Sequence, residues 1–208
     1  VVRRHAGVSG QLITRAARRE RVAAMVGGGD EVADAAVVPS TRPREFPPVL
    51  DLLAPACGVG GILGAAAAVG GDYPLSVWRL VAGTLLMGAV SDAMLLGHWY
   101  LVQPGLGRAP IRELVWCTIF VWPVEIAAFL WPTGMVQVLH GTVDDGWDGL
   151  LGWTWLACAA TTLGLAVLTL LALRERAYSA VMAATGLLYL AILTAFGTDL
   201  IARAVLAP

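Results

Sequence analysis

The chain has 208 residues, of which 58% are hydrophobic and only 14% are charged, and its mean hydropathy is +0.73. A soluble domain carries roughly 45–50% apolar and 25% charged residues, so this composition excludes an ordinary soluble domain. All 14 basic residues are arginine, and 15 acidic residues leave a net charge of −1, which excludes a basic nucleic-acid-binding protein. We therefore expect an integral membrane protein.

Five apolar stretches are long enough to cross a bilayer, because about 20 helical residues span a hydrocarbon core of about 30 Å. They cover residues 52–70, 77–102, 114–131, 150–173 and 180–206. The stretches are apolar on all sides, unlike the alternating segments of a membrane β-barrel. The expected fold is all-α: a polytopic membrane bundle of five transmembrane helices in residues 49–208, preceded by an arginine-rich tail in residues 1–48.

The charged residues are segregated along the chain in a way that predicts its orientation. Twelve of the 14 arginines lie before the first span, between spans two and three, or between spans four and five, three segments on one side of a five-span protein. The opposite loops carry Asp72, Asp144, Asp145 and Asp148. The positive-inside rule then predicts a cytoplasmic N-terminus and an outside C-terminus. We expect a multi-pass protein of the cell membrane, the inner membrane if the source is a bacterium.

Within the tail, residues 11–25 combine apolar residues with four arginines and can form a helix. One interpretation is an interfacial helix lying on anionic lipid. The other is a solvated, partly disordered tail, which arginine-rich segments of low hydrophobicity commonly form. The sequence leaves both open.

Ionisable side chains inside a membrane span are costly unless they have partners, so each is a candidate for function. A first set lies toward the predicted cytoplasmic end of the second and third spans: Asp92, His98, Trp99, Tyr100 and Glu113. Histidine can exchange a proton near neutral pH, and aromatic side chains can wall a quinone or lipid site. The alternative interpretation is that His98, Trp99 and Tyr100 only anchor the helix at the interface.

A second set lies toward the predicted outer ends of the spans: Arg79, Glu125, Asp199 and Arg203. Asp199 and Arg203 are four residues apart and can pair on one helix. Glu125 follows Pro123, which removes a backbone donor from the third span. The set is either a proton or substrate path with Glu125 as relay, or a structural charge network of two arginines and two carboxylates. The even charge balance favours the structural network.

Other motifs point to packing rather than chemistry. Gly60 and Gly64 form a GxxxG pattern, which predicts close helix packing within the bundle or against another subunit. We expect no bound metal, since no Cys/His spacing suits one. We do not expect haem, because His5, His98 and His140 lie at different predicted depths and cannot supply two axial ligands together. His98 and Met182 lie at similar predicted depth, but nothing else in the sequence supports them as a pair of haem ligands. No cofactor is predicted, although a quinone or lipid fits the first set.

Soluble-enzyme motifs are not found in the sequence, and we expect a protein that is not an enzyme. The leading hypothesis is a non-catalytic anchor or accessory subunit of a larger membrane complex, respiratory or redox, with membrane lipids and other membrane subunits as partners and no nucleic acid. A second hypothesis is a small proton-coupled carrier or channel that uses Asp92 and Glu125. A third is a quinone- or lipid-acting membrane enzyme that uses His98.

Overall fold

A computed structural model of the chain describes residues 48–102, 107–132, 134–175 and 177–206, and these residues are helical with short connections and no strand. Five of the described helices are long and apolar enough to cross a membrane, as the sequence predicts. The tail segment 11–25 lies outside the described residues. The elements are η1 (Pro48–Leu52), α2 (Leu53–Val69), α3 (Tyr73–Val102), α4 (Ala109–Leu130), α5 (Gly134–Leu139), α6 (Leu150–Ala172) and α7 (Tyr178–Val205).

The chain divides into two compact units, Val1–Gly60 and Gly61–Pro208, with the division inside α2. The first unit contains η1 and the first part of α2 among its described residues, and every described side chain from Leu50 to Gly60 is exposed. The second unit contains the rest of α2 and all of α3 to α7. The site described below lies wholly within this second unit.

The helix bounds match the predicted spans except at two starts and one short element. Helix α3 begins four residues before the predicted span, at Tyr73, and α4 begins five before it, at Ala109. The extra turns carry polar residues that lower the local hydropathy without breaking the helix. The short helix α5 was not predicted, because a six-residue helix has no periodicity to detect; its Met135 and Val138 are buried with Phe129 and Trp155.

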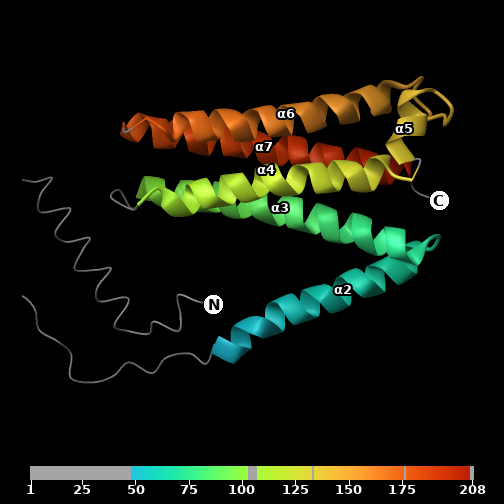
Figure 1. The fold of residues 1–208 in the computed structure, drawn as a ribbon, viewed down its shortest axis with the longest axis horizontal. Helices are drawn as coiled ribbons and strands as arrows, with labels where there is room; N and C mark the ends of the chain where they lie inside the picture. The colour runs from blue at the N-terminus through green and yellow to red at the C-terminus, as the bar shows by residue number, and fades with distance from the viewer. Residues whose placement is uncertain (1–47, 103–106, 133, 176, 207–208) are drawn as a thin grey trace, which may run out of the picture. The chain divides into compact units, whose positions relative to one another are not determined.

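Four helices of the second unit run side by side (Figure 1), and their contacts close a ring in which α3 packs on α4 and α7, and α6 packs on the same two helices. The described parts of two connections, residues 107–108 before α4 and residues 173–175 and 177 after α6, meet at one end, which we call the arginine end because Arg108, Arg112 and Arg174 lie there. Arg108 donates a hydrogen bond to the Ala177 carbonyl at 3.0 Å and so joins the two connections. The opposite end, which we call the acidic end, carries Asp72 and the Asp144–Asp148 loop.

Small side chains and threonines are frequent on the buried faces of the ring, and many large apolar side chains point outward, although others such as Leu86, Phe129 and Trp155 are buried. Leu193 and Phe120 are 67% and 68% exposed, whereas the buried face of α7 consists mainly of alanine and threonine. Small residues let helix backbones approach closely. The buried threonines keep their hydroxyls satisfied by donating to the carbonyl four residues earlier in the same helix: Thr118, Thr162, Thr169, Thr185 and Thr198.

Polar contacts near the middle of the helices also join them across the ring. The indole of Trp122 in α4 donates to the Ala159 carbonyl of α6 at 2.9 Å. The hydroxyl groups of Thr162 in α6 and Thr194 in α7 lie 2.8 Å apart, within hydrogen-bonding distance. A polar group in the middle of an apolar bundle is costly without a hydrogen-bond partner, and each of these contacts supplies one.

The loop before α6 is organised around Asp145. Its two carboxylate oxygens accept hydrogen bonds of 2.8–3.3 Å from the backbone N–H groups of Trp147, Gly149, Leu151 and Gly152. Desolvation by itself would raise the pKa of Asp145, but these four backbone donors together lower its pKa below the ordinary value. The carboxylate therefore caps the start of α6 at the acidic end.

Candidate functional site

The first predicted set is mostly exposed, with Tyr100 as the exception. Asp92, His98 and Glu113 are exposed, and Trp99 is 52% exposed, so these four side chains lie on the outside of the ring. Tyr100 instead is buried, and its hydroxyl donates to the Gly107 carbonyl in the connection to α4. Neighbouring residues of a helix point about 100° apart, which is why Trp99 and Tyr100 face opposite environments.

The second predicted set comes together near the acidic end, where α3 begins and α7 ends. Arg203 Nε donates to Asp199 Oδ2 at 2.7 Å, so this pair of α7 forms a salt bridge. The Nη2 of Arg203 reaches across to α3 and donates to the Arg79 carbonyl at 3.1 Å. Arg79 in turn donates its Nε to the Ala128 carbonyl of α4 at 3.1 Å. The two arginines therefore join α3, α4 and α7.

Gly83 allows this close approach of α7 to α3. A Cβ built at this position would lie 2.5 Å from Asp199 Oδ1 and 2.7 Å from Arg203 Nη2, closer than real Cβ contacts. The salt bridge thus packs directly on the backbone of α3. The remaining oxygen of Asp199, Oδ1, is buried and accepts no hydrogen bond from a described residue.

Glu125 is the most enclosed ionisable group that the structure describes. Its side chain in α4 is 0% exposed, and neither of its oxygens has a hydrogen-bond partner among the described residues. It therefore does not join the arginines through a direct contact, unlike Asp199. The charged form of a carboxyl group is costly in such a position.

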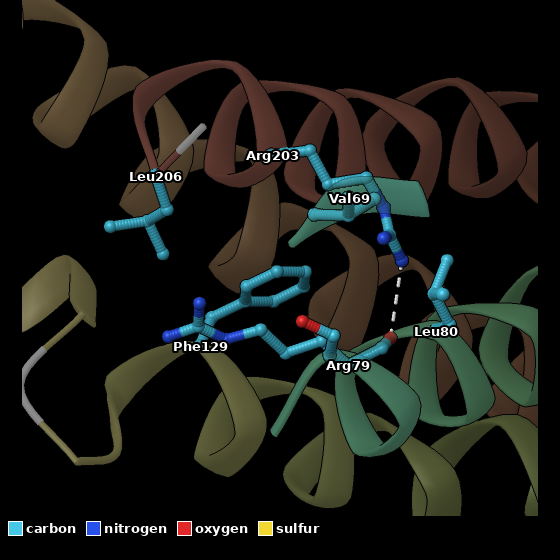
Figure 2. A pocket seen from close by; sticks show the side chains of 7 residues that line it. Val69, Arg79, Leu80, Phe129, Arg203 and Leu206 are labelled. Atoms are coloured by element: carbon cyan, nitrogen blue, oxygen red, sulfur yellow. Dashed lines mark hydrogen bonds between the residues drawn. The ribbon is translucent and has the colours of Figure 1, made fainter. Parts of the chain in front are cut away.

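Phe129 of α4 completes the site with an aromatic ring, which sequence reasoning missed. The guanidinium carbons of Arg79 and Arg203 lie 5.9 and 5.7 Å from the centre of this ring, within range of cation–π attraction. Figure 2 shows the ring between the two arginine side chains. One phenylalanine in an apolar helix gives no sequence signal of such a role, because core packing and cation binding use the same residue type.

A partly open cavity of about 310 Å³ adjoins this cluster (Figure 2). Its lining combines the two guanidinium groups and one hydroxyl with apolar side chains: Val69, Ser76, Arg79, Leu80, Phe129, Arg203 and Leu206. Such a mixture of convergent polar groups and apolar walls is typical of small-molecule sites, and the volume lies at their lower end of about 300 Å³.

Close helix packing occurs at glycines other than those of the GxxxG pattern. A Cβ at Gly64 would meet nothing within 4 Å in the described residues, whereas one at Gly97 of α3 would lie 2.9 Å from the Thr185 hydroxyl of α7. Gly83 and Gly97 are 14 residues apart, which is about four turns, so they lie on one face of α3. The role of Gly60 and Gly64 in packing stays a prediction. Comparison of the chain with family models, curated proteins and solved structures finds no match.

Proposed function

We propose that the protein is a multi-pass membrane protein that serves as a non-catalytic subunit of a larger membrane assembly. Many large apolar side chains of its helices are exposed, which suits a lipid surrounding better than water. The arginine end faces the cytoplasm in this proposal, by the positive-inside rule, and the acidic end faces outward.

The observation that carries the proposed role is the exposure of the Asp92 carboxyl group within a predicted membrane span. This residue lies ten residues, or about 15 Å, from the end of α3, and its side chain is exposed on the outside of the ring. A carboxyl group at that depth is costly against lipid, so it calls for a polar or cationic partner. Gly88 and Thr84 are exposed on the same face, four and eight residues before Asp92, and small residues permit close approach of another helix.

We expect a helix of a partner subunit to cover this face. A photoreactive amino acid in place of Leu95, which is 59% exposed beside Asp92, should form an adduct with a second membrane protein when the full chain is irradiated in its native membrane. The variant Asp92→Leu should reduce that adduct at least about tenfold, because the buried polar contact is lost. Mass spectrometry of the adduct gives the readout.

Position 193 supplies the control, since Leu193 of α7 is 67% exposed on another helix and should give no adduct of that mass. Asp92→Asn keeps the size and much of the hydrogen bonding and should retain part of the adduct. Equal adducts at both positions, an adduct only to residues 1–47 of the same chain, or a monodisperse monomer in mild detergent would each contradict the subunit proposal.

A second candidate, a proton-coupled carrier or channel, is favoured by Glu125 alone. A fully buried carboxyl group without hydrogen-bond partners is the kind of group that proton relays use. Glu125→Gln should then abolish a pH-dependent flux into liposomes that contain the purified protein, while Glu113→Gln, an exposed carboxyl at the arginine end, should leave it unchanged. Wild-type flux in both Glu125→Gln and Asp92→Asn removes this candidate.

A further inference from the structure

The cavity beside Arg79 and Arg203 has the chemistry of an anion site with an apolar flank. Two cationic side chains reach it from α3 and α7, and Val69, Leu80, Phe129 and Leu206 supply apolar walls. Figure 2 shows these four apolar side chains around the two arginines. A ligand that carries both an anionic group and an apolar part would match both kinds of wall.

The charges around the cavity are unevenly matched, and the excess lies on Arg79. Arg203 is paired with Asp199 at 2.7 Å. Arg79 donates its Nε to the uncharged Ala128 carbonyl, and its two Nη groups have no hydrogen-bond partner among the described residues. Glu125 makes no hydrogen bond to either arginine. A guanidinium group with free donors in a partly apolar cavity favours an oxyanion, which it can bind through two parallel N–H groups.

The position of the cavity along the helices fits a headgroup. Arg79 lies six residues after the start of α3, and Arg203 two residues before the end of α7. Trp78 and Trp131 beside it are 41% and 60% exposed, with ring centres 5.9 Å apart. Exposed tryptophans gather at the depth of lipid headgroups, where phosphate groups are concentrated.

We propose that this cavity binds a singly charged phosphate group, with Arg79 as its main contact and Arg203 adding positive potential. The phosphate comes either from an anionic phospholipid, whose first acyl carbons lie against Leu80 and Phe129, or from free inorganic phosphate. This site does not depend on the partner subunit proposed above, because all of its residues belong to this chain.

The test uses the full-length protein, purified in detergent with equal amounts of phosphatidylglycerol and phosphatidylcholine, and native mass spectrometry counts the retained lipids. Wild-type protein should retain one phosphatidylglycerol in preference to phosphatidylcholine. Arg79→Gln should reduce that preference about tenfold, as expected for the loss of a charge-assisted contact. Ser76→Glu leaves Arg79 in place but puts a carboxylate in the cavity, and it should reduce the preference as well.

Arg112→Gln is the matched control, because Arg112 is an exposed arginine at the other end of the ring and its loss should leave lipid retention unchanged. A second arm measures the thermal midpoint with inorganic phosphate. A rise in wild type that is missing in Arg79→Gln identifies free phosphate as a sufficient ligand, whereas phosphatidylglycerol retention without that rise identifies the lipid. Equal retention of both lipids with no effect of phosphate, or equal losses in Arg79→Gln and Arg112→Gln, overturns the proposal.

Discussion

Replacing Arg203 by leucine should lower the free energy of unfolding by about 3 kcal/mol. The change leaves Asp199 without its cation, and breaking a buried ion pair costs about 3–5 kcal/mol. The lower end of that range applies here, because the Arg203 and Asp199 side chains are still 32% and 19% exposed. The change also removes the hydrogen bond to the Arg79 carbonyl and so a connection between α7 and α3. Reversible unfolding in mixed micelles, titrated with dodecyl sulfate and followed by circular dichroism, measures the difference.

The double variant Asp199→Leu/Arg203→Leu should recover a large part of that loss, since an apolar pair of similar volume often replaces an ion pair without destabilisation. Arg112→Leu, which removes an exposed arginine, should change stability by less than about 1 kcal/mol. If the double variant is as unstable as Arg203→Leu, the salt bridge is not what holds this end of the bundle, and the contact to the Arg79 carbonyl is the stronger candidate.

Gly83→Ala should lower the free energy of unfolding by about 1–3 kcal/mol, the usual cost of overpacking a close contact. The added methyl group would lie 2.5 Å from Asp199 Oδ1, so the salt bridge has to move away from the backbone of α3. Asp199 has a short side chain that Arg203 already holds, so it cannot swing aside freely. The same dodecyl sulfate titration gives the readout.

Gly88→Ala is the internal control for helix propensity. Gly88 lies in the same helix, is exposed, and has nothing within 4 Å of an added Cβ. Alanine there should be neutral or stabilising by up to about 1 kcal/mol, because alanine is the better helix former. Equal effects of the two substitutions would show that α7 does not approach α3 closely at Gly83.

For the second set of residues, the depth of each side chain along its helix was predictable from the sequence, whereas the direction in which it points around the helix axis was not. Counting residues from the ends of the spans already placed Arg79, Glu125, Asp199 and Arg203 at similar depth, and the structure brings Arg79, Asp199 and Arg203 into one set of contacts. The same count could not tell that Glu125 turns to an enclosed position without a hydrogen bond. Helix rise is the same for every residue type, but rotation about the helix axis depends on the neighbouring helices.

The arrangement of Asp92, His98 and Tyr100 illustrates the same limit. All three belong to one conspicuous stretch of sequence, yet only Tyr100 is buried. In a soluble helix an apolar stripe marks the buried face. Helix α3 is apolar on nearly every side, so its sequence carries no such stripe, and the small residues Gly83 and Gly97 mark its buried face instead.

The sequence by itself determined the number and position of the candidate spans and the segregation of arginines and aspartates to alternate connections. Both are properties of whole segments: hydropathy sums over about 20 residues, and charge is read from the connections between them. Only the tertiary structure decided which faces meet, why Phe129 lies beside two arginines, and where a cavity remains. Those features arise from segments far apart in the chain, such as those that carry Arg79 and Arg203, 124 residues apart. Close packing between distant segments has no signature within any one of them.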